Sequence, residues 1–487
     1  MMAVTALPEN WISCRLGDLL AFEYGKSLTK SARSGNGEYP VFGSNGVVGL
    51  HDVYLVEGPV IIVGRKGAAG SVCYSEANCW PIDTTYYIRS GQFLNSKFVY
   101  YLLHSLNLAK LETSTAIPGL NREKAYDETV FLPPLAEQHR IVAKIEELFS
   151  ELDQGVASLK TAREQLKVYR QSLLKNAFEG KLTAAWRAAH PDQLETAAAL
   201  QQRIARERQA RYQQQLADWQ TAGQPGSKPK PPKPLPPLTA EELADLPELP
   251  AGWAWFKVNH LCDVVRGGSP RPAGDPKYYG GNIPFLKVAD ITRNPSPYLS
   301  TYSFTITEAG LNKTRQIEPN TLLLSNSGAT LGVPKICLIS ATMNDGVAAF
   351  LGLPSEELLY HYYFWQSQTE NLRNIDQGAA QPNLNTDLIK ETLIPVCSAA
   401  EQIIVTERLE TALSEADQLD QTLATALQQA DALRQSILKK AFHGQLEKQA
   451  KNDEPATALL ERIRAARVTS PAKGRQAKLG SKPLPNC

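Results

Sequence analysis

The stretch of sequence that decides the fold is Arg-Gln-Ser-Leu-Leu-Lys-Asn-Ala-Phe-Glu-Gly-Lys-Leu, at residues 170–182. It returns at residues 434–446 as Arg-Gln-Ser-Ile-Leu-Lys-Lys-Ala-Phe-His-Gly-Gln-Leu, a shift of 264 residues. The same shift carries Glu137-Gln138 onto Glu401-Gln402, and Pro118-Gly119-Leu120-Asn121 onto Pro382-Asn383-Leu384-Asn385. A repeat kept in register over such a span predicts a chain that is built twice, with two similar surfaces and a target in two parts.

Around these landmarks the apolar residues are spaced alternately three and four apart. One such seam consists of Ile145, Leu148, Leu152, Gly155, Leu159, Ala162, Leu166, Tyr169 and Leu173. The other consists of Leu409, Ala412, Ala416, Leu419, Leu423, Ala426, Ala430, Leu433 and Ile437. A stripe this narrow is typical of a coiled coil and not of a helix on a broad core.

The two seams predict two helices of roughly 40 residues, each about 60 Å long at 1.5 Å per residue. Because both seams share one register, we expect the helices to pack on each other in antiparallel orientation. Gly180 and Gly444 suit left-handed residues at the two C-terminal ends. The alternative is a pair of unrelated helices that bridge solvent.

Size and composition limit the class of protein. A chain of 487 residues has room for two or three domains with proper cores. A net charge of +1 excludes a polybasic nucleic-acid binder, but basic residues clustered on one face could still bind nucleic acid. The seven cysteines form no CxxC pair, which favours reduced thiols in a cytoplasmic protein. No apolar run approaches membrane length and no secretion leader is evident, so no membrane partner is expected.

The globular parts of the chain also follow a two-part plan. From residue 10 to about residue 132, short β-branched runs such as residues 60–63 and 86–89 alternate with glycine-rich turns. The opening Pro8-Glu9-Asn10-Trp11 has a counterpart in Pro250-Ala251-Gly252-Trp253. Further helices are expected over residues 96–111 and 195–220. The proline-rich run at residues 225–237 predicts a stiff, extended linker, because proline blocks both helix and sheet.

We therefore expect an α+β fold in which two mixed α/β domains are separated by two long antiparallel coiled-coil helices, with an internal pseudo-twofold repeat. The expected division is a first domain at 1–132, a first helical region at 133–182, a helical extension at 183–221, a proline-rich linker at 222–250, a second domain at 251–394, a second helical region at 395–447, and a helical, then disordered basic tail at 448–487.

Catalytic motifs are absent from the sequence. Gly25-Lys26-Ser27 resembles the end of a phosphate-binding loop, but the first glycine of that motif would fall on Leu20. The glycines at 64, 67 and 70 have the spacing of a turn and not of a dinucleotide fingerprint. Residues 294–298 resemble the Asn-Pro-Pro-aromatic motif of adenine methyltransferases, but Ser296 splits the prolines. The histidines form no metal-ligand pair. We expect a chain that is not catalytic by itself, with no metal and no cofactor.

These residues together resemble one family, the specificity subunits of type I DNA restriction-modification systems. The resemblance rests on the Leu-Pro-Pro-Leu-Ala-Glu-Gln entry at 132–138, its counterpart at 394–402, the two repeated helix ends, the extension at 180–187 and the two Trp-containing domain openings. The sequence departs from the pattern in its long proline-rich linker and in Val396-Cys397-Ser398 at the second entry.

The resemblance implies two target-recognition domains, at 1–132 and 251–394, that each read one half of a split site in double-stranded DNA. It also implies that the long helices recruit two adenine methyltransferase subunits, which restriction subunits with motor and nuclease activity then join. The leading hypothesis is thus a non-catalytic DNA-specificity subunit. The alternatives are a coiled-coil scaffold that presents two protein-binding domains, and a standalone modification enzyme.

The residues that contact DNA are predicted from the chemistry of base and phosphate recognition. Arginine and asparagine form bidentate pairs with guanine and adenine, whereas lysine and serine more often hold phosphates. The candidate DNA-binding residues of the first domain are Ser44, Asn45, Arg65 and Lys66. Those of the second domain are Arg266, Arg271, Lys277, Tyr278, Asn326 and Ser327. Arg65 and Asn326 follow similar strands and are expected to serve one half-site each; the alternative for each candidate is an ordinary solvated surface residue.

Overall fold

The computed structural model describes residues 7–34, 36–111, 119–224, 227–232, 234, 236–328, 330–374 and 384–469. Three expectations concern residues outside these ranges: the basic end of the tail, part of the proline-rich linker, and part of the repeat at Pro118 and at Pro382-Asn383. The chain divides into two compact units. Unit 1 contains residues 1–161 and 423–487, and unit 2 contains residues 162–422.

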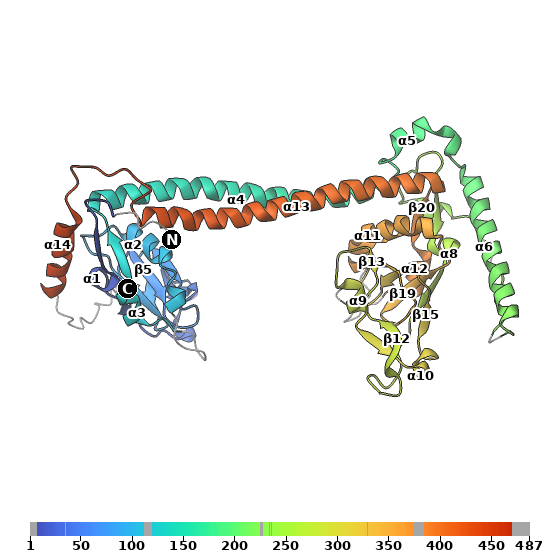
Figure 1. Cartoon of the computed structure of the whole chain (residues 1–487), viewed down its shortest axis with the longest axis horizontal. Coiled ribbons are helices and arrows are strands. Elements are labelled where there is room, and N and C mark those ends of the chain that lie inside the picture. The colour runs from blue at the N-terminus through green and yellow to red at the C-terminus, as the bar shows by residue number, and fades with distance from the viewer. Residues whose placement is uncertain are drawn as a thin grey trace, which may run out of the picture. The chain divides into compact units, whose positions relative to one another are not determined.

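Two long helices, α4 (Leu135–Phe178) and α13 (Ala399–Ala441), each contribute residues to both units (Figure 1). In unit 2, Arg163 and Arg170 of α4 form ion pairs with Asp420 and Asp417 of α13, at 2.8 and 2.5 Å. Residue numbers rise along α4 while those of its partners fall along α13, so the helices are antiparallel. This prediction is confirmed.

The predicted seam between these helices is buried at only one of its two heptad positions. The buried residues at this position are Ile145, Leu166 and Leu173 on α4, and Leu409, Ala416, Leu423, Ala430 and Ile437 on α13. The second position was expected to be buried as well, and at four places this was wrong: Gly155, Tyr169, Leu419 and Leu433 are exposed. The remaining residues of the second position, Leu148, Ala162, Ala412 and Ala426, are half-buried, so the partner helix covers this row only in part.

The globular domain of unit 1 is built on two small sheets. The first has the order β2 (Glu23–Tyr24), β8 (Thr85–Ile88), β5 (Val60–Gly64) and β6 (Val72–Ser75). The second has the order β4 (Gly46–His51), β3 (Tyr39–Gly43) and β7 (Trp80–Pro81). The helical segments of this unit are α1 (Leu16–Leu19), η1 (Lys30–Ala32), α2 (Ser96–Ser105), η2 (Leu108–Leu111), α3 (Arg122–Asp127) and α14 (Ala456–Thr469). Strand β5 is buried at every residue, because it lies between two strands and under α2.

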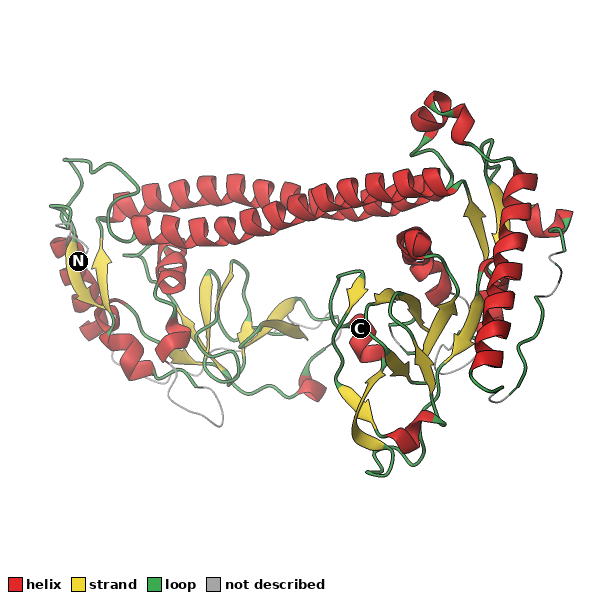
Figure 2. Cartoon of the chain, turned by 45° about the vertical axis from the view of Figure 1, so that its right-hand side comes forward, coloured by secondary structure: helices red, strands yellow, loops and turns green. Residues whose placement is uncertain are grey.

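The globular domain of unit 2 has the same plan with longer sheets. The first sheet has the order β11 (Asp263–Arg266), β19 (Val347–Leu351), β16 (Thr321–Ser325), β17 (Pro334–Cys337) and β13 (Tyr298–Leu299). The second has the order β14 (Phe304–Ile306), β12 (Tyr279–Leu286), β18 (Ala341–Met343) and β15 (Arg315–Ile317). The helical segments are α5 (Ala184–Ala189), η3 (Pro191–Gln193), α6 (Ala197–Thr221), α7 (Ala240–Leu243), α8 (Val258–Leu261), α9 (Val288–Thr292), α10 (Glu308–Leu311), η4 (Ser355–Glu357), α11 (Leu358–Asn374) and α12 (Thr386–Glu391). Figure 2 shows strands and helices mixed in both domains, which confirms the α+β class.

Each domain opens and closes with an antiparallel strand pair that leads into a long helix. In unit 1, β1 (Ile12–Arg15) pairs with β9 (Thr129–Leu132), three residues before α4 begins. In unit 2, β10 (Ala254–Lys257) pairs with β20 (Leu393–Val396), three residues before α13. Strand β20 thus continues two residues past the boundary expected after residue 394.

Outside the long pair, the sequence predicts some helices better than others. The helix expected over residues 96–111 ends early: α2 stops at Ser105, and η2 follows Asn107, which has a φ of 49°. The helix expected over residues 195–220 is confirmed as α6. Among the described residues, no helix is both long and apolar enough to cross a membrane.

The glycines that follow the two long helices have left-handed backbones, as predicted, with φ of 70° at Gly180 and 68° at Gly444. A Cβ on Gly180 would lie 2.5 Å from Pro250 Cγ, and one on Gly444 would lie 2.3 Å from Pro8 Cγ. Alanine at either position must adopt an unfavourable backbone and displace a proline. The repeated glycine therefore serves both the helix end and its contact with the domain opening.

We expect Gly180→Ala and Gly444→Ala each to destabilise the unit that contains it, by about 1–2 kcal/mol from the left-handed backbone alone. Calorimetric unfolding of the full chain measures this effect. The matched control is Gly155→Ala, in the exposed middle of α4, where a Cβ meets nothing within 4 Å. That change should stabilise the protein by roughly 0.5–1 kcal/mol, because alanine favours helix. Equal effects at all three positions would contradict this account of the helix ends.

Candidate nucleic-acid interface

Loops of unit 1 meet at the main chain of Thr84, directly before strand β8. The Thr84 carbonyl accepts hydrogen bonds from the backbone N–H groups of Arg65, at 2.9 Å, and Lys66, at 3.2 Å. The Ser44 hydroxyl donates to the same oxygen at 2.6 Å. The structure thus brings Ser44, Arg65 and Lys66 together, and Asn45 is exposed beside Ser44.

The guanidinium of Arg65 is held by the backbone. Its Nε and Nη2 donate to the carbonyl oxygen of Asp83, at 3.1 and 2.6 Å. The group also lies 5.4 Å from the centre of the Tyr24 ring, and Arg122 lies 5.5 Å from the same ring. A cation over an aromatic face is attracted by the ring's negative face, so Tyr24 helps to orient both arginines.

Unit 2 repeats the main-chain arrangement around Asn326. The N–H of Asn326 donates to the Gly346 carbonyl at 3.0 Å, as the N–H of Arg65 donates to Thr84. The carbonyl of Asn326 accepts from Leu384 N–H at 2.7 Å, and that of Arg65 accepts from Leu120 N–H at 3.0 Å. Leu120 and Leu384 belong to the sequence repeat, so the predicted correspondence of the two loops holds at the backbone.

The side chain of Asn326 behaves differently from that of Arg65. It is fully buried, and neither of its polar atoms has a hydrogen-bond partner among the described residues. A base contact by Asn326 would therefore need its surroundings to open. Ser327 is half-buried next to it. DNA contact by these two residues stays a prediction.

The other candidates of unit 2 lie at the end of β11 and along the loop between β11 and β12. Arg266, the last residue of β11, donates from Nε to the Asp345 carbonyl at 2.6 Å. Arg271 and Lys277 are exposed, and Lys277 Nζ lies 5.4 Å from the centre of the Tyr278 ring. Among these described candidates, only the Arg266 side chain donates a hydrogen bond to the backbone two residues before strand β19. Arg271 and Lys277 lie in the loop itself.

Sequence reasoning missed Tyr24, Arg122 and Lys287. Tyr24 belongs to a strand of two residues, which is too short for a periodic signal. Arg122 directly follows the repeated Leu-Asn pair, and this position is the signal that could have found it. Lys287 Nζ lies 3.3 Å from the centre of the Phe304 ring, on a neighbouring strand of the second sheet of unit 2. No spacing rule predicts that contact.

The repeated glutamates at the start of the long helices are buried and have a structural role. Glu137 accepts hydrogen bonds from Trp11 Nε1 at 3.0 Å and Gln449 Nε2 at 2.7 Å. Burial raises the pKa of the Glu137 carboxyl, while these two hydrogen bonds oppose the rise. Its counterpart Glu401 accepts from the Thr183 hydroxyl at 2.6 Å.

Glu401 is also paired with Arg187, at 2.6 Å. The exposed fraction of the side chain is 0% for Glu401 and 11% for Arg187. Arg187 Nη2 donates to the Gly180 carbonyl at 2.6 Å, so one guanidinium ties the end of α4 to the start of α13 within unit 2.

We expect Arg187→Ala to destabilise unit 2 by about 3–5 kcal/mol, because it leaves the Glu401 carboxylate buried without a compensating charge. Differential scanning calorimetry of the full chain measures the loss. The double variant Arg187→Ala, Glu401→Gln removes the orphaned charge and should recover a large part of the stability. Equal losses in the single and double variants would show that packing around Arg187 matters and that its charge does not.

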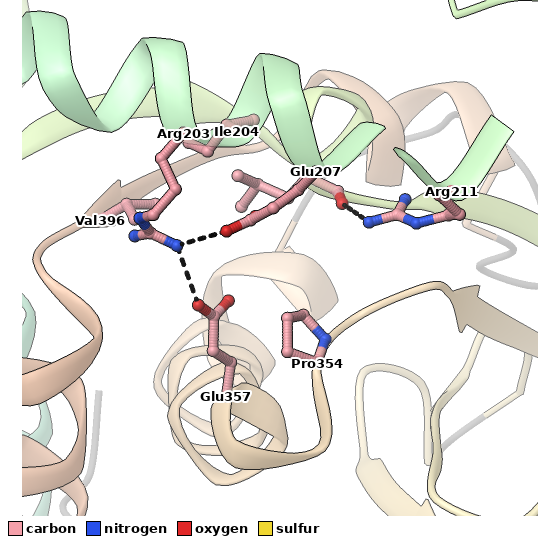
Figure 3. Close-up of a pocket in the computed structure, with 8 residues that line it drawn as sticks. Arg203, Ile204, Glu207, Arg211, Pro354, Glu357 and Val396 are labelled. Atoms are coloured by element: carbon pink, nitrogen blue, oxygen red, sulfur yellow. Dashed lines mark hydrogen bonds and ion pairs between the residues drawn. The ribbon is translucent and has the colours of Figure 1, made fainter. Parts of the chain in front are cut away.

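A pocket between α6 and the domain of unit 2 offers little to nucleic acid (Figure 3). Arg203 on α6 pairs with Glu195, Glu207 and Glu357, at 3.1, 3.0 and 3.4 Å. Three carboxylates around one guanidinium repel phosphate. The network instead fastens α6 to the domain, together with the buried side chains of Leu200 and Ile204.

Within the described ranges, no group of three or more metal-ligating side chains lies together. The six cysteines described are free: Cys14, Cys73, Cys79, Cys262, Cys337 and Cys397. Burial raises the pKa of Cys14 and Cys79 to about 12, which keeps both thiols protonated and unreactive at neutral pH.

The sequence and the fold of this chain are similar to those of known proteins. The EcoDI type I restriction enzyme specificity subunit of Escherichia coli is 23% identical to this chain, over 97% of the chain and 98% of that protein. The EcoBI type I restriction enzyme specificity subunit of Escherichia coli is 24% identical over 78% of the chain and 73% of that protein. A solved chain from a type I R-M system has a similar fold, with a TM-score of 0.61 and 17% identity, covering 91% of this chain and 100% of its own.

The model of one family, the type I restriction modification DNA specificity domain, matches this chain twice, at residues 8–160 and 250–429. Each match spans a globular domain and much of the long helix that follows it. Because the two matches cover more than half of the sequence, the chain belongs to the type I restriction-modification DNA specificity family.

Proposed function

We propose that this chain is the specificity subunit of a type I restriction-modification complex and that it acts in the cytoplasm without catalysing a reaction itself. The two globular domains, proposed at residues 1–132 and 251–394, each read one half of a bipartite site in double-stranded DNA. The observation that carries this proposal is the twin loop: Arg65 and Asn326 follow equivalent central strands and make the same backbone hydrogen bonds. Two equivalent loops suit two short DNA elements.

The loops offer the chemistry that such recognition needs. Arginine and asparagine read base edges, and lysine and serine hold phosphates. In unit 1, Arg65 lies beside Lys66 and Ser44 around one carbonyl oxygen. In unit 2, the loop with Arg271, Lys277 and Tyr278 supplies exposed cations. A net charge of +1 leaves further phosphate contacts to partner subunits.

The exposed row of the long helices, which consists of the second-position residues Gly155, Tyr169, Leu419 and Leu433, is proposed to recruit methyltransferase subunits. Tyr169, in unit 2, and Leu433, in unit 1, are 264 residues apart and occupy equivalent places on α4 and α13. Their exposed fractions are 48% and 51%, which is high for large apolar residues on a helix pair. Equivalent apolar positions in the two units suit two copies of one partner. Restriction subunits with motor and nuclease activity would then join this core.

The deciding experiment is single-molecule sequencing of adenine methylation in DNA that was exposed to the chain assembled with its methyltransferase subunits. We expect one methylated motif with two specified elements separated by an unspecified gap. Methylation without sequence preference would overturn the proposal. A scaffold that presents protein-binding domains would instead assemble its partners without changing which DNA is modified.

A further inference from the structure

The central sheets of the two domains can be aligned residue by residue. In unit 1, Gly64 at the end of β5 is paired with Thr85, the first residue of β8. In unit 2, Ser325 at the end of β16 is paired with Val347, the first residue of β19. Strand β8 therefore corresponds to β19, and β5 to β16.

The edge strands follow the same alignment. The N–H of Gly25, after β2, donates to the carbonyl of the first residue of β8 at 3.1 Å, and the N–H of Gly267, after β11, donates to that of β19 at 3.0 Å. The preceding residues, Tyr24 and Arg266, therefore occupy equivalent places. Arg266 corresponds in sequence to Tyr24, and not to Arg65.

The two arginine side chains nevertheless reach the same point. Asp83 and Asp345 each lie two residues before their strand, β8 or β19, and are equivalent. Arg65 donates to the Asp83 carbonyl through Nε and Nη2, and Arg266 donates to the Asp345 carbonyl through Nε. Arg65 directly follows the central strand β5, whereas Arg266 ends the edge strand β11. The position that supplies the guanidinium therefore differs between the two domains, whereas the backbone carbonyl that accepts its hydrogen bond is equivalent.

This anchoring leaves the same part of each side chain free. A guanidinium has five N–H donors in a fixed planar fork, and the carbonyl occupies the edge that contains Nε. The end of the fork, formed by Nη1 and the outer N–H of Nη2, remains available. Within the part of the chain that the structure describes, Arg65 and Arg266 form no ion pair that would occupy it. An anchored side chain also loses less conformational entropy when it binds.

We propose that Arg65 and Arg266 are the matched guanine readers of the two domains, one for each half-site. The proposal rests on the DNA-recognition function proposed above. An arginine fork fits the O6 and N7 atoms of guanine, which is the commonest specific contact in the major groove. The anchoring residue is an aspartate in both domains, and Asp83 is exposed. A carboxylate at this place repels phosphate, so a phosphate contact by the free end of the fork is disfavoured.

The test measures both the methylated motif and binding to altered duplexes, with the complete methyltransferase complex. Arg65→Ala should relax one G·C position in one half-site, and Arg266→Ala one G·C position in the other, each with about tenfold or greater loss of discrimination. Arg→Lys at either place keeps the charge and should not restore selectivity, because lysine cannot form the fork. Lys66→Ala is the control, and it should weaken binding to all sequences equally.

A second measurement uses the unaltered protein. Replacing the guanine of each relaxed position by 7-deazaguanine removes the N7 acceptor, and binding by the wild-type complex should fall severalfold. The corresponding arginine variant should not distinguish the two duplexes. If both variants keep the full motif, or lose affinity uniformly as Lys66→Ala does, the guanine-reading proposal is wrong. A wild-type complex with no sequence preference would instead overturn the DNA-recognition function itself.

Discussion

A complex assembled with Tyr169→Glu should contain one methyltransferase subunit instead of two, and the double variant Tyr169→Glu, Leu433→Glu should contain none and methylate no DNA. The reason is that each residue is a large apolar side chain exposed at the open row of the helix pair. If a partner buries that row, a carboxylate there loses its hydration without gaining a counter-charge, which is costly. Native mass spectrometry gives the stoichiometry, and methylation of a target duplex gives the activity.

Leu433→Glu alone should remove the other copy of the partner, because the two positions are equivalent under the 264-residue repeat. Gln429→Glu is a matched control on α13, since this residue is exposed but polar and should leave both copies bound. If the double variant still binds two subunits, the partner binds elsewhere on the chain. Loss of both subunits in each single variant would mean that the two partners bind cooperatively and not at independent sites.

The exposed row also shows where sequence reasoning succeeds and where it stops. The three–four spacing correctly predicts the two long helices. The register of the repeat and the two glycines correctly predict their antiparallel packing and left-handed ends. It treats both heptad positions alike, however, although the residues of the first position are buried more deeply than those of the second. Leu423 and Leu433 are indistinguishable in the pattern, yet Leu423 is buried and Leu433 is half exposed. How deeply each row is buried against the partner helix depends on how the two helices are rotated, and that is a property of the pair.

The candidate DNA-contacting residues divide in a similar way. The sequence correctly matches the backbone of the loop at Arg65 with that at Asn326, because both follow a similar apolar strand. The structure adds that each loop accepts a hydrogen bond from the leucine of a repeated Leu-Asn pair. It does not predict that the Asn326 side chain is buried. Nor does it reveal that Arg266 takes the place of Arg65 at the equivalent carbonyl. Those facts depend on contacts between strands that are tens of residues apart, and no local spacing records them.

The second prediction with a large expected effect concerns the length of the helix pair, which we expect to set the gap between the two DNA half-sites. Seven residues inserted near Ala157 in α4 alone would leave the added turns without a partner, because α13 runs antiparallel beside α4. The Arg434–Asp153 ion pair places Ala157 level with the region of Gln429 on α13. A matched heptad must therefore be added at both places, which preserves the buried row on each helix.

With matched heptads in both helices, we expect each half-site to be unchanged and the gap to grow by about three base pairs, since seven residues add about 10 Å of helix. Sequencing of the methylated motif measures the gap. Two residues added at both places rotate the following helix by about 200° relative to its row, which should break the packing and abolish modification. Active protein with an unchanged gap after heptad insertion would mean that the helices do not set the distance. The two domains would then have to reach their half-sites through a flexible connection, and the constant register of the 264-residue repeat would serve recruitment of the partner subunits alone.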